Sequence, residues 1–175
     1  PTTEVIEEIY TKPSKKKLRQ LLKKISEHYK PNKKHGFYTL TDNYFFLESV
    51  RNHVEEKKID MIVMGTKGAS GLREYIVGSN TGDVITKVKC TTLVVPEYAK
   101  YTELKEIAFP SDFNLSYNIK ILQPLTDILK DVNGNLRIIH IKNKGASLNS
   151  EQDNNKQLLN DYFEEFDPSF HFLTN

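Results

Sequence analysis

The stretch Asp60–Pro96 reads DMIVMGTKGASGLREYIVGSNTGDVITKVKCTTLVVP, and it holds four of the eight glycines of this 175-residue chain between Gly65 and Gly78. An apolar run, Met61–Met64, precedes the glycines, and a second apolar run follows them. Glycine loses the most conformational entropy on folding, so a cluster marks a sharp turn or a close approach to the main chain. The stretch therefore predicts a buried strand, a glycine loop, a helix capped by Ser79 and a second strand.

Patterns typical of helices and strands alternate along the rest of the chain. Helical spacing of apolar residues occurs at about 15–29, 44–57, 79–89, 115–131 and 151–166. Runs typical of strands lie at 37–41, 61–65, 91–96, 106–112, 136–142 and 170–174. This alternation predicts an α/β fold with an open, doubly wound, mostly parallel sheet of Rossmann-like type.

Two parts of the chain resemble each other. The sequence QLL at Gln20–Leu22 recurs at Gln157–Leu159, an offset of 137, and FYTLT at Phe37–Thr41 recurs as FHFLT at Phe170–Thr174, an offset of 133. The two offsets differ by four because the loop between helix and strand is shorter in the second part. A helix followed by a strand is thus present twice, which indicates a tandem duplication.

Composition excludes several classes of protein. The chain has 38% hydrophobic and 27% charged residues, and it contains no apolar run near the roughly 20 residues that a membrane span needs. We therefore expect a soluble globular protein without a membrane partner. Its single cysteine, Cys90, permits no internal disulfide, which favours the cytoplasm. Since the sequence begins at Pro1, the question of whether a targeting segment precedes it stays open.

A basic block runs from Lys12 to Lys34 and contains ten lysines and arginines. Such a block attracts nucleic acid in some proteins. Here Leu18, Leu21, Leu22 and Ile25 recur inside it at helical spacing, so we interpret the cations as the solvated face of an amphipathic helix and expect no nucleic-acid partner.

Other chemical constellations are not apparent. The five histidines have no spacing to cysteine or carboxylate that indicates a metal site, and Cys90 has no base beside it in the sequence. No pair of residues is typical of a general acid and base. We therefore predict no catalytic residue and no metal ligand.

The pattern Gly65, two residues, Gly68, nine residues, then Gly78 and Ser79 resembles the nucleotide-binding signature of the universal stress protein family. The flanking DMIVMGTKG and TTLVVPEY are also similar to that family, and FPSDF at Phe109–Phe113 resembles its first strand with the aspartate that ends it. The resemblance covers nearly the whole chain in an unusual order. It implies that residues 1–100 are helix 2 to strand 5 of a first repeat and residues 101–175 are strand 1 to strand 3 of a second.

The resemblance implies binding of ATP, with or without Mg²⁺, to a doubly wound five-stranded sheet. Phosphates and ribose are then expected at Gly65, Gly68, Gly78 and Ser79, with Lys67, Asn80 and Thr81 beside them. The nucleoside is expected at Asp112, with Pro110 and Ser111 next to it, and the main chain at Ile141 is expected to contact adenine.

The residues expected to contact ATP belong to both repeats, so neither repeat alone contains a complete site. One hypothesis is a circularly permuted domain in which EIAFPSD pairs with MIVMG and brings Asp112 near Gly65. The other is completion by a partner chain. A surplus helix and strand remain in either case, and we expect a homodimer or a swapped oligomer.

The sequence thus predicts an adenine-nucleotide-binding protein of stress response or signalling, with assembly linked to the nucleotide and at most slow ATP hydrolysis. The alternative is a nucleotide-free scaffold that dimerises through TTLVVP at the sheet edge. A nucleotide hydrolase or transferase dependent on Asp112 is a third reading. Gly82 and Asp83 decide between the ATP-binding protein and the nucleotide-free scaffold, because a flexible first turn and a negative charge near the motif disfavour phosphate binding.

Overall fold

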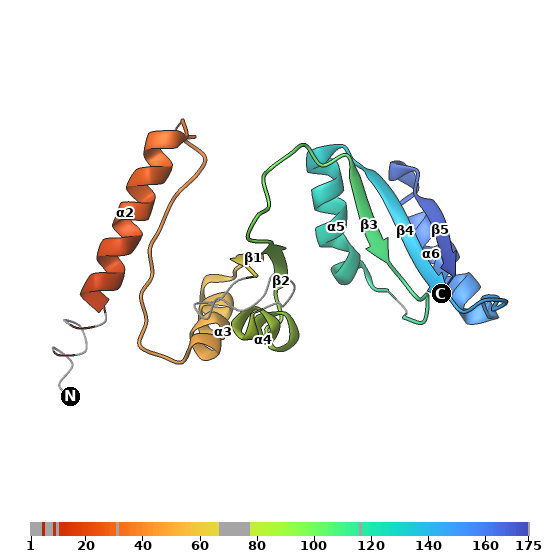
Figure 1. The fold of residues 1–175 in the computed structure, drawn as a ribbon, viewed down its shortest axis with the longest axis horizontal. Coiled ribbons are helices and arrows are strands. Elements are labelled where there is room, and N and C mark those ends of the chain that lie inside the picture. Colours follow the sequence, from red (N-terminus) through yellow and green to blue (C-terminus); the bar gives the residue numbers. More distant parts are fainter. Residues whose placement is uncertain are drawn as a thin grey trace. The chain divides into compact units, whose positions relative to one another are not determined.

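The computed structural model describes residues 5, 9, 11–30, 32–66, 78–115 and 117–174. The chain divides into two compact units, Pro1–Tyr98 and Ala99–Asn175, whose elements are labelled in Figure 1. Both units combine helices with parallel strands, which confirms the α/β fold predicted from the alternating patterns.

The described residues of the first unit form one small parallel sheet and three helices. Its elements are α2 (Lys12–His28), α3 (Phe46–Lys57), β1 (Met61–Gly65), α4 (Ser79–Lys87) and β2 (Thr91–Val95). Strands β1 and β2 pair in parallel, with Val63 opposite Leu93. Helix α4 lies against β2 and buries Thr81 and Val84, because these two residues fall three positions apart on one helix face.

The second unit contains a three-stranded parallel sheet with β4 at its centre. Its elements are β3 (Glu106–Pro110), α5 (Ile119–Val132), β4 (Asn135–Lys142), α6 (Ser150–Tyr162), the short 3₁₀ helix η2 (Glu164–Phe166) and β5 (Ser169–Thr174). The sheet order is β3-β4-β5. The buried core contains Phe113, Leu122, Leu129, Leu136, Ile138, Leu159 and Phe163.

Local sequence explains why α5 and α6 begin where they do. The Asn118 side chain accepts a hydrogen bond from the Ile121 N–H at 3.2 Å and caps α5. Asn149 accepts from the Gln152 N–H at 2.8 Å, and the Gln152 side chain accepts from the Asn149 N–H at 3.0 Å. This reciprocal capping box satisfies two donors that α6 leaves unpaired at its start.

One expectation about strands differs from the structure. Phe37–Thr41 is not a strand, and the side chains of Phe37 and Tyr38 are 61% and 89% exposed. The similar sequence of β5 is a strand because β4 supplies its hydrogen bonds, whereas no described strand pairs with 37–41. Within the two units β1 pairs with β2 and β3 pairs with β4, while the pairing of EIAFPSD with MIVMG joins strands of different units and stays a prediction.

Candidate functional site

The carboxyl end of β1 is tied directly to the first turn of α4. The hydroxyl of Thr81, which is buried, donates to the Gly65 carbonyl at 2.8 Å. The Gly78 N–H donates to the Thr66 carbonyl at 2.8 Å, and the Thr66 N–H donates to the Val95 carbonyl at 3.2 Å. These three hydrogen bonds hold the helix start beside the ends of both strands.

The N-terminus of α4 leaves its backbone donors without a side-chain cap. The capping residue is Gly78, and Ser79 is the first helical residue, so the prediction of Ser79 as the cap is wrong by one position. Gly78 has no side chain to accept a hydrogen bond, and the first turn of any helix lacks internal acceptors for its N–H groups. The N–H groups of Ser79, Asn80 and Thr81 are therefore donors suited to an anion, which the helix dipole also favours.

Two residues of α4, Gly82 and Asp83, are expected from the sequence to disfavour phosphate binding, and their surroundings in the structure bear on this expectation. The Asp83 carboxylate contacts the Lys87 ammonium at 2.5 Å, one turn toward the end of α4. This pair directs the negative charge away from the helix start and compensates it. A Cβ added at Gly82 meets no atom of the described residues within 4 Å, so their packing does not require this glycine.

Packing among the described residues also does not require a glycine at position 65. A Cβ added there meets, among these residues, only the Val95 carbonyl oxygen, at 3.9 Å, which is an ordinary van der Waals contact. The absence of a side chain instead leaves the end of β1 open to approach by another group. Lys67 and Gly68, also predicted at this site, lie outside the described residues.

The second group of predicted residues lies at the carboxyl edge of β3 and β4. The Ser111 N–H donates to the Ile139 carbonyl at 2.9 Å, directly after Pro110 ends β3. The hydroxyl of Ser111 lies 2.9 Å from that of Tyr117 and accepts from the Phe113 N–H at 3.0 Å. Ser111 is thus buried and committed to the structure of this turn.

Asp112 and Ile141 are exposed, as is Pro110, whereas Ser111 is buried. The Asp112 carboxylate accepts from the Asn114 N–H and from the Asn114 side-chain amide, both at 3.0 Å. These bonds lower the pKa of Asp112, so it is an anion at neutral pH. Ile141 is 66% exposed at the end of β4.

His140 holds this edge together in a way that the sequence did not indicate. Its ring is buried, stacks on Phe113 with centroids 5.0 Å apart, and places Nδ1 2.9 Å from the Ser111 carbonyl oxygen. The pattern of β4 identified it only as a strand residue. Its partners come from the turn after β3, and periodicity carries no information about contacts between distant segments.

A polar cluster that sequence reasoning missed lies at the start of α3. Asp42 accepts from the Ser49 hydroxyl at 2.7 Å and lies 3.2 Å from His53 Nε2. The hydrogen bond from Ser49 is the largest cause of the lowered pKa of Asp42. The serine and histidine both contact the carboxylate, so the cluster lacks the serine-to-histidine hydrogen bond of a nucleophile and its base.

Replacing Asn114 with alanine is expected to raise the pKa of Asp112 toward its ordinary value. The change removes one of the two donors to the carboxylate and keeps the backbone N–H. The carboxylate stabilises the fold above its unfolded-state pKa, and that contribution is lost as pH falls through the lower folded-state pKa. Carbon-detected NMR titration measures the shift. An unchanged Asp112 midpoint contradicts the assignment, while Asp42 serves as the internal reference.

The predicted residues thus form two groups, one in each unit. Gly65, Gly78, Ser79, Asn80 and Thr81 belong to Pro1–Tyr98, and Pro110, Ser111, Asp112 and Ile141 belong to Ala99–Asn175. Within the described ranges, no three histidine, cysteine or acidic side chains gather in a way that could hold a metal ion. No helix among these residues is long and apolar enough to cross a membrane.

The region around β1 and α4 is similar in sequence to known proteins. Residues 48–96 match the model of the Universal stress protein family. Over 46 residues the chain is 39% identical to universal stress protein YxiE of Bacillus subtilis, a match that covers 26% of this chain and 31% of that protein. This region includes all of β1, α4 and β2.

Solved structures agree on the fold. A universal stress protein from Archaeoglobus fulgidus matches with a TM-score of 0.52 and 16% identity, over 74% of this chain and 47% of that one. A putative universal stress protein from Pseudomonas aeruginosa matches with a TM-score of 0.56 and 12% identity, over 91% of this chain and 59% of that one. The chain therefore spans about half the length of these structures and about a third of the Bacillus protein.

Proposed function

Since residues 48–96 match the model of the Universal stress protein family, we propose that this chain binds ATP at the junction of β1 and α4 and acts in stress response or signalling. The hydrogen bond between the Thr81 hydroxyl and the Gly65 carbonyl carries this proposal. It fixes the uncapped first turn of α4 at the end of a parallel strand, where α/β sheets bind their ligands.

The residues of this junction have the chemistry that a polyphosphate requires. The N–H groups of Ser79 and Asn80 provide donors, and the exposed hydroxyl and amide side chains of the same two residues add further hydrogen bonds. Because Gly65 and Gly78 have no side chains, the phosphates approach the main chain closely at these two positions. Bound ATP supplies a tetraanion, or a dianion with Mg²⁺, and Lys67 in this proposal offsets part of that charge.

The nucleoside end of the ligand is assigned to the second group of residues. The Asp112 carboxylate is exposed and anionic, so it suits a ribose hydroxyl, while the backbone at Ile141 offers a carbonyl and an N–H to adenine. Pro110 and Ser111 hold the turn that presents Asp112. A complete site requires both groups, and we propose that assembly into a homodimer or swapped oligomer is linked to ATP in the cytoplasm.

Isothermal titration of ATP into the full chain, with and without Mg²⁺, tests this proposal. The expected result is saturable binding near one site per chain, with displacement by ADP and none by inorganic phosphate alone. Binding that is equally strong for phosphate means an anion site without nucleoside recognition. Absence of heat at millimolar ATP contradicts the proposal. Light scattering of the same samples reports the linked change in oligomeric state.

A nucleotide-free scaffold that dimerises through β2 is the second candidate. Val63, Leu93 and Val95 are exposed on the sheet of β1 and β2, and such apolar surface on a parallel sheet favours coverage by protein. A stable dimer in the absence of ATP, combined with no heat of ATP binding, supports this candidate over the first.

A further inference from the structure

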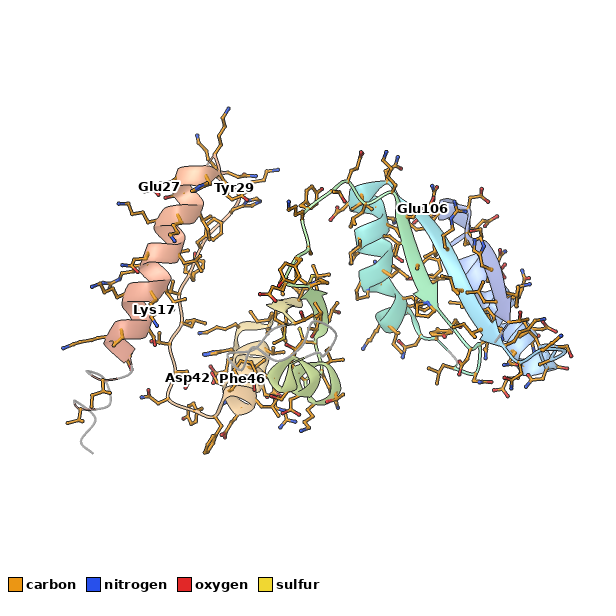
Figure 2. All side chains as sticks on the ribbon, viewed as in Figure 1. Lys17, Glu27, Tyr29, Asp42, Phe46 and Glu106 are labelled. Atoms are coloured by element: carbon orange, nitrogen blue, oxygen red, sulfur yellow. The ribbon has the colours of Figure 1, made fainter. Side chains whose placement is uncertain are left out.

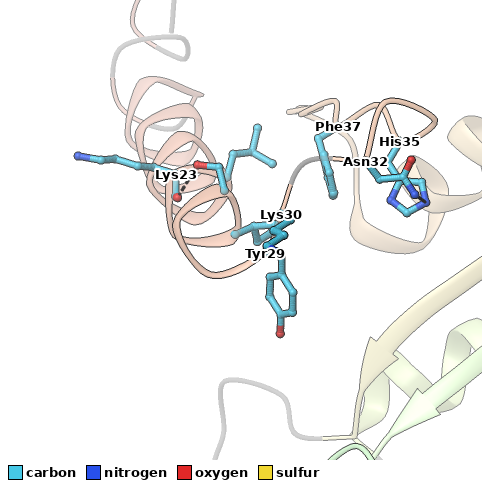
Figure 3. A pocket seen from close by; sticks show the side chains of 9 residues that line it. Lys23, Tyr29, Lys30, Asn32, His35 and Phe37 are labelled. Carbon is cyan, nitrogen blue, oxygen red and sulfur yellow. Dashed lines mark hydrogen bonds between the residues drawn. The ribbon is translucent and has the colours of Figure 1, made fainter.

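A pocket at the end of α2 has only local polar contacts. Its volume is about 830 Å³, and apolar side chains form most of its lining (Figure 3). Among the described lining residues, the Ser26 hydroxyl donates to the Lys23 carbonyl, and the Asn32 amide lies 3.4 Å from His35 Nε2. Each pair is three positions apart, so these bonds hold no distant segment in place.

Polar side chains from distant segments converge instead on the turn after β3. The carbonyl oxygens of residues 111–113 each lie within hydrogen-bond distance of a different side chain. The donors are, in order, His140 Nδ1 at 2.9 Å, Gln152 Nε2 at 2.8 Å and Asn155 Nδ2 at 2.8 Å. The first belongs to β4 and the other two to α6, whose side chains Figure 2 shows as sticks. We call these three side chains the turn clamp.

The backbone of this turn contains a strained residue. Phe113 has a φ of +59°, in the left-handed region that a bulky residue rarely adopts. The other described non-glycine residues with positive φ are the C-caps of α3, α5 and η2, where this conformation is common: Lys58, Asn133 and Asp167. Phe113 caps no described helix, so the groups around it must impose its conformation.

Burial and the turn clamp together fix Phe113. Its ring is fully buried and stacks on His140, with centroids 5.0 Å apart. Its carbonyl accepts from Asn155, whose side chain belongs to a residue only 6% exposed. Asp112 lies between the buried Ser111 and the buried Phe113 and is itself exposed. The strained turn therefore presents the Asp112 side chain to solvent.

Gln152 joins the turn to the start of α6. Its side-chain oxygen accepts from the N-cap N–H, and its Nε2 donates to the Asp112 carbonyl. A capping box needs only the oxygen, which glutamate also provides, so the amide nitrogen serves the turn. At the offset of 137, Gln152 and Asn155 correspond to Lys15 and Leu18 of α2. The first repeat thus forms the equivalent helix without either amide.

We propose that His140, Gln152 and Asn155 are positioning residues for nucleoside binding, which hold the turn so that Asp112 is oriented toward the ribose before ATP binds. The inference rests on the proposed function, because it concerns the nucleoside end of the same site. Each residue acts through a backbone carbonyl of the turn and does not itself contact the ligand. A group that is already ordered loses less conformational entropy on binding, which increases affinity.

Gln152→Glu tests the turn clamp without removing the cap of α6. The new carboxylate fills the same capping box but cannot donate to the Asp112 carbonyl. Isothermal titration of ATP into the full chain is expected to show about tenfold weaker binding, which is the loss of about one charge-assisted hydrogen bond. Asn154→Asp is the control for charge, since it adds the same charge at an exposed position of α6.

Asn155→Leu tests the buried member of the turn clamp without any change of charge. It removes the donor to the Phe113 carbonyl at similar side-chain size, and ATP binding is again expected to weaken about tenfold. Asn154→Leu makes the same replacement at the exposed neighbour and should leave ATP affinity unchanged. If urea unfolding shows that Asn155→Leu does not fold, Gln152→Glu decides the test.

A measurement without ATP separates positioning from general stability. The hydrogen bonds from Asn114 that lower the pKa of Asp112 depend on the shape of the turn. Carbon-detected NMR titration is therefore expected to show a higher pKa of Asp112 in Gln152→Glu and Asn155→Leu, and no change in the two Asn154 variants. A merely structural role lowers resistance to urea but leaves this pKa unchanged in the folded protein.

Three results overturn the proposal. The first is an unchanged ATP affinity and an unchanged Asp112 pKa in Gln152→Glu and in folded Asn155→Leu. The second is an equal change in the matching Asn154 variants. The third is a loss of stability against urea without any change in the Asp112 pKa. If the wild-type chain binds no ATP, the proposed function fails by itself, and the Asp112 pKa alone then decides whether the turn clamp positions this carboxylate.

Discussion

Replacement of Gly78 with valine is expected to lower ATP affinity at least about a hundredfold. Gly78 caps α4 with φ −55° and ψ 148°, a conformation that valine also adopts, so the fold should tolerate the change. The branched side chain then stands before the first-turn N–H groups. Loss of two charge-assisted hydrogen bonds, each about 1.5–3 kcal/mol, gives this magnitude. Isothermal titration of ATP measures it.

Gly82→Ala is the matched control for this experiment. Position 82 lies in the same helix, and a Cβ added there meets no atom within 4 Å in the part of the chain that the structure describes. ATP affinity should stay unchanged, while helix stability should increase by about 0.5–1 kcal/mol because alanine favours the helix. Equal losses of affinity in both variants, or an unaltered affinity in Gly78→Val, contradict a phosphate site at the start of α4.

Replacement of Phe163 with alanine is expected to destabilise the second unit by about 3–5 kcal/mol. Its side chain is fully buried in the core and meets Tyr162 edge to face, with ring centroids 4.8 Å apart. Truncation removes this apolar burial and leaves a cavity between α6 and the sheet. Urea unfolding followed by circular dichroism and tyrosine fluorescence measures the change.

Leu158→Ala provides the comparison for Phe163→Ala. Leu158 precedes the buried Leu159 in α6 but is 58% exposed, so its truncation should cost no more than about 0.5 kcal/mol. A loss below about 1 kcal/mol for Phe163→Ala contradicts the role of Phe163, the residue that caps the end of α6, in the core.

The periodicity of apolar residues was sufficient to predict the described α-helices α2–α6 and the five strands, because alternation and helical spacing are local properties of the chain. It failed at Phe37–Thr41, where FYTLT has the composition of a strand but no described partner. A strand is defined by its neighbour, and β5, with nearly the same sequence, has one in β4. Pairing is decided by contacts between distant segments, which a local pattern does not contain.

The sequence by itself determined the parallel α/β class, the strand, glycine loop and helix around β1 and α4, and the resemblance to the universal stress protein family. Tertiary structure alone decided that Gly78 caps α4, that Thr81 is locked to Gly65, that Asp83 pairs with Lys87, and that the buried His140 holds the turn of Ser111. The reason is physical. Backbone preferences act between residues a few positions apart, whereas hydrogen-bond satisfaction and burial depend on groups that only folding brings together.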